Sequence, residues 1–188
     1  MEFNEIIKTT VEVLNKGGVI LYPTDTVWGI GCDATNSEAV KRIYRIKRRE
    51  DSKSMLCLTE TTARVDWYFD RVPEIAWDLW EVTDKPLTLI LPRARHIAPE
   101  LIAADGTMGM RVTSEKVSSS ICARLKRPLV STSANISGEP TARCFADISD
   151  EIKNAVDYIV PLRQEETENP QPSGIIKVDD GGVIKVIR

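Results

Sequence analysis

The chain has 188 residues, of which 42% are hydrophobic and 28% charged, with a formal net charge of −3. This length suits one globular domain that needs no disulfide or metal to hold its core. A slightly acidic chain lacks the basic excess of general nucleic-acid binders. The four cysteines show no CxxC spacing, which argues against structural zinc. With no signal-peptide pattern and no stretch of roughly 20 apolar residues, we expect a cytoplasmic protein.

Hydrophobic periodicity predicts alternating helices and strands. An N-terminal helix stops at Gly17-Gly18, and Asn36 is a plausible cap for the second helix. A hairpin around residues 179–182 closes the chain, and the acidic stretch 161–172 is expected to be a mobile loop. Together these elements predict an α/β fold with a mixed sheet. Further helices are expected from Pro73, from Ser114 as cap and over 148–155, with strands over 19–22, 55–58, 87–91, 109–112, 129–130, 175–178 and 183–187.

Several common kinds of catalytic chemistry have no support in the sequence. The single histidine, His96, has no nucleophile elbow beside it, so a catalytic triad is disfavoured. No phosphate-binding GxxxxGK[ST] loop occurs. Gly29-Ile30-Gly31 lacks the third glycine of a dinucleotide fingerprint and indicates a tight turn or a close backbone approach.

Three polar segments remain as candidate ligand-binding loops. The segment 22–31 holds two threonines and an aspartate after a buried strand; the alternative is a self-bonded turn. The basic segment 47–53 is either a helix end that complements the helix dipole or an exposed loop that clamps phosphates. The segment 131–141 carries many hydroxyl groups after a strand, and they can donate to one anion or ribose.

The order of these segments resembles a known family. Pro23-Thr24-Asp25-Thr26-Val27-Trp28-Gly29, Lys47-x-Arg49 and Ser133-Ala134-Asn135-x-Ser137-Gly138 occur as in the YrdC-like, or TsaC-type, threonylcarbamoyl-AMP synthases. Supporting matches begin at Pro86, Thr107 and Pro172. The resemblance implies a twisted mixed parallel and antiparallel sheet with flanking helices and a deep, positively lined central groove. It also implies a single catalytic domain over residues 1–188.

The implied activity condenses L-threonine, bicarbonate and ATP to threonylcarbamoyl-AMP and pyrophosphate, for the threonylcarbamoyladenosine modification of tRNA. Mg²⁺ would accompany ATP, with no metal held by the protein alone. Other tRNA-modification proteins that transfer the threonylcarbamoyl group are the implied partners, with no membrane and no strong direct binding of nucleic acid.

The resemblance also implies the roles of individual residues. Lys47 and Arg49 are expected to be catalytic, and Arg111 is the natural partner of the threonine carboxylate. The expected threonine-binding residues are Thr26, Arg111, Ser131 and Ser173. The expected ATP-binding residues are Arg49, Lys53, Thr107, Ser133, Asn135, Thr141 and Arg188.

Some positions depart from the family pattern. Glu50 stands where the family usually has proline, and Ser54 stands where proline or glycine is common. Leu58 stands where longer relatives often have a ligand-facing histidine. Two alternatives remain. One is a non-catalytic RNA-binding module that uses the cluster Lys47 to Lys53, which the acidic balance disfavours. The other is a carbamoyl-transfer module of the hydrogenase-maturation type, which in those proteins accompanies zinc motifs that are missing here.

Overall fold

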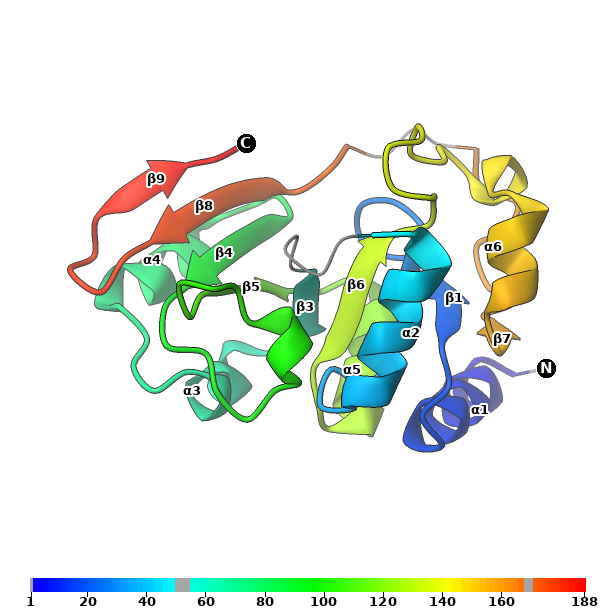
Figure 1. Cartoon of the computed structure of the whole chain (residues 1–188), viewed down its shortest axis with the longest axis horizontal. Coiled ribbons are helices and arrows are strands. Elements are labelled where there is room, and N and C mark those ends of the chain that lie inside the picture. Colours follow the sequence, from blue (N-terminus) through cyan, green and yellow to red (C-terminus); the bar gives the residue numbers. More distant parts are fainter. Residues whose placement is uncertain (1, 50–54, 168–170) are drawn as a thin grey trace.

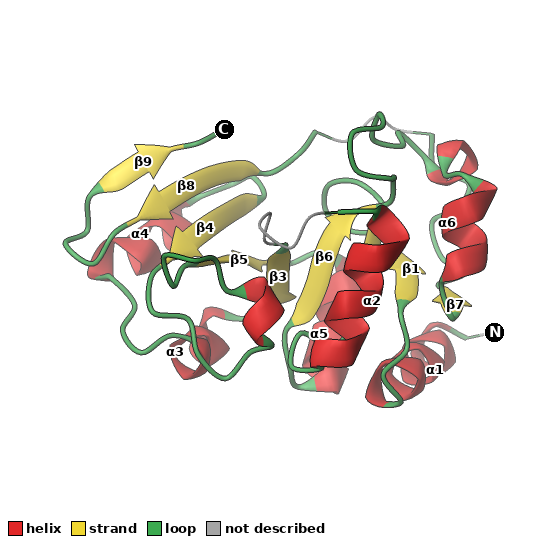
Figure 2. Cartoon of the chain, in the orientation of Figure 1, coloured by secondary structure: helices red, strands yellow, loops and turns green. Residues whose placement is uncertain are grey.

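The computed structural model describes residues 2–49, 55–167 and 171–188. Within these residues one sheet has the strand order β7-β1-β2-β6-β3-β5-β4-β8-β9, with helices against both faces (Figure 1; Figure 2). Its strands are β1 (Ile20–Tyr22), β2 (Gly29–Gly31), β3 (Leu56–Thr59), β4 (Leu87–Leu91), β5 (Met108–Val112), β6 (Leu129–Ser133), β7 (Tyr158–Ile159), β8 (Gly174–Val178) and β9 (Ile184–Val186). The α-helices are α1 (Phe3–Asn15), α2 (Ser37–Lys47), α3 (Val65–Tyr68), α4 (Glu74–Val82), α5 (Lys116–Leu125) and α6 (Asp150–Ala155), with short 3₁₀ turns at Thr62–Arg64, Pro99–Leu101 and Phe145–Asp147.

The sheet is mixed, as the sequence predicts. Strand β1 pairs antiparallel with β2 and parallel with β7. In the other half, β3 pairs parallel with β5, and β4 pairs parallel with β8. The antiparallel pair of β8 and β9 confirms the closing hairpin.

Each face of the sheet has its own apolar core. On one face, Leu21, Ile30, Cys57 and Met110 pack with side chains from α2, α4 and α6. On the other face, α1 and α5 pack over the ends of β1, β3 and β6. These two helices cover only part of their face, so polar residues further along the strands stay open to a ligand.

The ends of two helices show how local sequence sets the elements. Asn36 Oδ1 accepts from Ala39 N at 3.1 Å and caps α2, which confirms the prediction. The prediction that Ser114 caps α5 is wrong. Glu115 takes this role, because its carboxylate accepts from the backbone N–H groups of Val117 and Ser118 at 3.0 and 2.7 Å.

Gly31 meets the close backbone approach that the sequence predicts. A Cβ at this position would lie 2.7 Å from Tyr22 Cε1 and closer still to the carbonyl oxygen of Val130. Only glycine lets β2 fit here between its neighbours. Among the described residues, no helix is long and apolar enough to cross a bilayer.

Candidate active site

A cavity of about 680 Å³ lies on the face of the sheet that α1 and α5 leave open. Alternate residues along a strand point to the same face, so the strand register explains its floor. Ser131 lies opposite Leu56, and Arg111 lies opposite Thr88. The strand residues that line the floor on this face are Gly29, Leu56, Thr88, Ile90, Gly109, Arg111, Ser131, Ser133 and Ile175. Six neighbouring strands, from β2 to β8 in the order of the sheet, therefore form the floor of one volume that suits a small molecule.

One wall of the cavity is the turn after β1. Thr24 Oγ1 donates to the carbonyl of Val27 at 2.8 Å and accepts from Thr26 N at 3.0 Å. The two threonine hydroxyls also share a hydrogen bond of 3.1 Å. This self-bonding is the turn chemistry of the alternative interpretation. The same turn also places Thr26 in the cavity lining, and the ligand-binding interpretation stays a prediction.

Arg111 is the buried cation of the cavity, with only 2% of its surface exposed. Its Nη2 lies 2.9 Å from Asp25 Oδ1 and 3.4 Å from Thr26 Oγ1. Burial raises the pKa of the Asp25 carboxyl, although Arg111 opposes that effect. Arg111 Nε has no hydrogen-bond partner among the described residues. A buried guanidinium with an unused donor suits a carboxylate ligand.

Arg49 reaches the cavity because helix α2 ends just before it. Arg48 adopts a left-handed conformation at φ 49°, and Arg49 N then donates to the carbonyl of Tyr44 at 3.0 Å. Arg49 lines the cavity, and burial lowers the pKa of its guanidinium. Lys53, together with Glu50 and Ser54, lies outside the described residues.

Lys47 differs from the expectation of an exposed loop. It is the last residue of α2 and is 1% exposed. Its Nζ donates to the carbonyl oxygens of Ser133 and Asn135, the latter at 2.6 Å. Burial, followed by the charge of Arg49, lowers the Lys47 pKa to about 8. The expected exposed loop is therefore wrong for Lys47, whose ammonium holds the end of β6 and is not among the lining residues.

The loop after β6 divides into lining and supporting residues. Ser131, Ser133 and Thr141 line the cavity, as expected. Asn135 does not belong to the lining. Its Nδ2 donates to the carbonyls of Ile136 and Glu139, each at 2.9 Å, and so holds the loop in shape.

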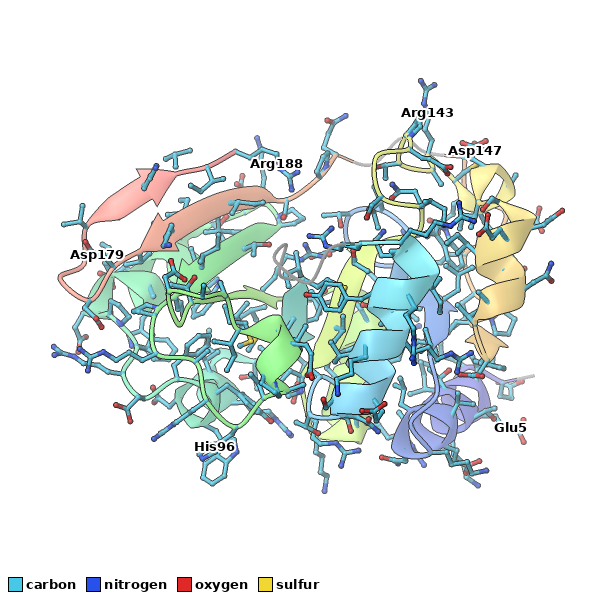
Figure 3. All side chains as sticks on the ribbon, in the orientation of Figure 1. Glu5, His96, Arg143, Asp147, Asp179 and Arg188 are labelled. Carbon is cyan, nitrogen blue, oxygen red and sulfur yellow. The ribbon has the colours of Figure 1, made fainter. Side chains whose placement is uncertain are left out.

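The C-terminal wall joins two predicted residues to an unpredicted one. Ser173 Oγ and Thr88 Oγ1 share a hydrogen bond of 2.9 Å, and Arg188 Nε donates to the carbonyl of Ser173 at 3.0 Å. Figure 3 shows Arg188 on the same side of the molecule as Arg143. Thr88, Arg143 and Gln171 line the cavity although no site role was predicted for them from the sequence. Thr88 stands in the Pro86 motif, which was a usable signal, whereas the other two follow no pattern.

Thr107 completes the lining from the loop before β5. Its hydroxyl donates to Asp105 Oδ1 at 2.6 Å, and Lys177 Nζ pairs with the other oxygen of the same carboxylate. Lys177 first and Thr107 second lower the Asp105 pKa to about 2. Asp105 is thus an anion that orients Thr107.

The cavity as a whole is cationic and rich in hydroxyl groups. Arg49, Arg111, Arg143 and Arg188 are lining residues, while none of the described lining residues is Asp or Glu. Such a surface suits a ligand with several negative charges, with arginine forks for carboxylate or phosphate groups.

Comparison with known proteins agrees with this geometry. Residues 12–188 match the model of the Sua5/YciO/YrdC family, which is described as telomere recombination. A relative from Pseudoalteromonas translucida, named threonylcarbamoyl-AMP synthase, is 31% identical over 98% of this chain and 100% of its own length. This chain belongs to the Sua5/YciO/YrdC family.

Solved structures of Sua5/YciO/YrdC proteins share the fold. The structure of E. coli YciO has a TM-score of 0.84 and 27% identity, covering 100% of this chain and 89% of its own. P. abyssi Sua5, complexed with L-threonine, has a TM-score of 0.87 at 22% identity, which shows the fold alone. The present chain spans only 54% of that Sua5 chain.

Family membership and burial bear on two further points, the RNA-binding alternative and the place of Leu58. The RNA-binding alternative is not favoured, because Lys47 of its basic cluster is buried and the relatives are named as synthases. Leu58 is fully buried in the core under α1 and α5, beside Arg111 in the strand register. It therefore adds no polar group to the cavity.

Proposed function

We propose that this chain is an L-threonylcarbamoyladenylate synthase, which forms threonylcarbamoyl-AMP and pyrophosphate from L-threonine, bicarbonate and ATP. The observation that carries the proposal is that one cavity gathers Thr26, Arg49, Arg111, Ser133 and Arg188 from distant parts of the chain. A relative named threonylcarbamoyl-AMP synthase matches over 98% of this chain. Residues 1–188 would form one catalytic domain.

The amino-acid subsite would lie at Arg111. Its guanidinium would bind the threonine carboxylate, with hydroxyl groups of Thr26, Ser131 and Ser173 around the rest of the molecule. Asp25 contacts the same guanidinium from the turn 24–27 and would keep it in place before threonine binds.

The nucleotide subsite would lie between Arg49 and Arg188. These cations, with Lys53, would neutralise the phosphates of ATP, while Thr107, Ser133 and Thr141 would donate to ribose or phosphate oxygens. Asn135 and Lys47 would act on the nucleotide by fixing the backbone after β6.

The reaction follows from holding the two substrates side by side. The threonine amine adds to carbon dioxide derived from bicarbonate and loses a proton, which yields a carbamate. A carbamate oxygen then forms a bond to the α-phosphorus, the bond from that phosphorus to the bridging oxygen breaks, and pyrophosphate leaves. Charge passes to pyrophosphate in this step, so arginines near it would stabilise the transition state.

Magnesium would enter as part of the nucleotide substrate. Among the described residues, no group of three or more His, Cys, Asp and Glu side chains could hold a metal ion, and the described lining offers hydroxyls and arginines. Phosphate oxygens and water would supply most of the ligands of Mg²⁺.

The product would serve tRNA modification in the cytoplasm. Threonylcarbamoyl-AMP is a mixed anhydride, and other proteins of that modification would pass its threonylcarbamoyl group to adenosine in tRNA. They are the partners that we propose for this chain.

The direct test measures pyrophosphate release with ATP and bicarbonate, comparing L-threonine with L-serine, L-valine and no amino acid. We expect release to require both L-threonine and bicarbonate. Equal release without threonine would reduce the activity to nucleotide hydrolysis and would contradict the proposal.

A further inference from the structure

Arg163 lies where the chain begins to cross the molecule. The chain leaves β7 at one edge of the sheet and next joins β8, close to the other edge. In Figure 1, β7 lies on the right beyond β1, and β8 lies on the left between β4 and β9. Arg163 comes four residues after the end of β7 and adopts φ 59°, a left-handed conformation that arginine seldom takes. Its side chain is therefore aimed by an unusual local turn.

The Arg163 side chain contacts the turn after β1, the N-terminal cap of α5 and a glutamate of its own segment. Its Nη1 donates to the carbonyl oxygen of Thr24 at 3.0 Å and lies 3.1 Å from Glu115 Oε1. Its Nε lies 2.8 Å from each carboxylate oxygen of Glu166. Arg163, within the stretch 161–172 that is expected to be a mobile loop, therefore has both charged and backbone partners.

Two of these partners belong to elements that carry the amino-acid subsite. Thr24 opens the turn whose Thr26 lines the cavity. Glu115 caps α5, which follows directly after β5 and its Arg111. Arg163 is itself absent from the described lining. Any effect it has on a ligand must therefore pass through these neighbours.

We infer that Arg163 is a positioning residue of the threonine subsite, because it ties the turn 24–27 to the cap of α5 and so sets Thr26 against Arg111. The inference rests on the proposed function.

A simple surface ion pair is the competing explanation. Exposed ion pairs contribute little to the stability of a protein, and removing one leaves ligand binding unchanged. The bond to the Thr24 carbonyl distinguishes the two explanations, because a charged donor to a partly buried backbone oxygen is stronger than an exposed pair.

The test compares Arg163→Met with Arg95→Met in the pyrophosphate assay. Arg95 pairs with Asp70 on the surface at 3.0 Å and is a matched control outside the cavity lining. We expect Arg163→Met to raise the threonine KM about tenfold, as for the loss of a charged hydrogen bond, with the KM of ATP and kcat nearly unchanged. Arg95→Met should match the parent in all three.

Further variants protect the test against misfolding. Arg163→Lys keeps the charge beside Glu115 but has no fork to reach Thr24 and Glu166 together, so its threonine KM should lie between those of parent and Arg163→Met. Glu115→Gln keeps a capping oxygen. Its effect on the threonine KM should not add to that of Arg163→Met, because both substitutions remove the same ion pair between Arg163 and Glu115.

The outcomes separate the two proposals. A parent without threonine-dependent release would contradict the proposed function. An active parent, together with Arg163→Lys and Arg163→Met variants that keep its threonine KM, would overturn the role of Arg163 alone. A rise in the ATP KM equal to that for threonine would also overturn it, because the inference assigns Arg163 to one subsite.

Discussion

Asp25 Oδ1 lies 2.9 Å from Nη2 of Arg111, a residue that lines the cavity. The Arg111 side chain is 3% exposed and the Asp25 side chain 14% exposed. Burial raises the Asp25 pKa in spite of Arg111, so the buried environment disfavours the ionised form of the Asp25 carboxylate. Asp25 therefore orients the Arg111 guanidinium, whose Nε has no hydrogen-bond partner among the described residues.

We expect Arg111→Lys to raise the threonine KM while the binding of ATP changes little. Lysine keeps the charge but has no fork for two carboxylate oxygens. The carboxylate is present in substrate and product alike, so the loss falls on binding more than on the chemical step. Calorimetry with threonine and a non-hydrolysable ATP analogue measures this. Unchanged threonine affinity would show that Arg111 binds another group.

Arg49→Ala should lower kcat/KM, because the loss of one oriented donor costs about 2–4 kcal/mol of transition-state stabilisation. The free energy of unfolding should change little, because Arg49 stands after the last residue of α2. Arg48→Ala is the matched control, since Arg48 pairs with Glu151 on the surface. If both variants turn over like the parent, Arg49 only complements the helix dipole.

Lys47→Met should behave differently from Arg49→Ala by destabilising the fold. It removes the donor for two carbonyl oxygens at the end of β6, at a cost of about 1–3 kcal/mol. Denaturant unfolding should show this loss, and the ATP KM should rise because the loop after Ser133 shifts. Parent-like stability with a lower kcat would instead support direct catalysis by Lys47.

The lowered pKa of Lys47 also predicts that the free energy of unfolding depends on pH. Its pKa is about 8 in the folded chain, below the ordinary 10.5 of the unfolded chain. Between these values the unfolded chain binds more protons, so the Lys47 contribution to the free energy of unfolding rises with pH. The difference in stability between parent and Lys47→Met should therefore increase from pH 8 to pH 10. A constant or falling difference would contradict the lowered pKa.

Bare tRNA should bind weakly, and added salt should abolish the binding. The chain carries a net charge of −3, and its buried Lys47 cannot neutralise a phosphate. A filter-binding or fluorescence titration at two salt concentrations tests this. Tight binding that survives salt and ignores threonine would restore the RNA-binding alternative.

Much of the secondary structure could be predicted because its signals are local. The cap at Asn36, the stop at Gly17 and the hairpin around residues 179–182 depend on a few neighbouring residues. The cap of α5 was misplaced by one residue, because Ser114 and Glu115 both suit a cap and only the packed chain decides between them.

The sequence by itself also determined the family and the polar motifs, because these follow from residue order. It could not determine which residues of each motif line the cavity. Lys47 and Arg49 stand two apart, yet the end of α2 buries one and turns the other into the cavity. Arg163 has no motif at all. Two of its partners, Thr24 and Glu115, lie 139 and 48 residues away, and only the packing of β1, α5 and the segment after β7 brings them within hydrogen-bond distance.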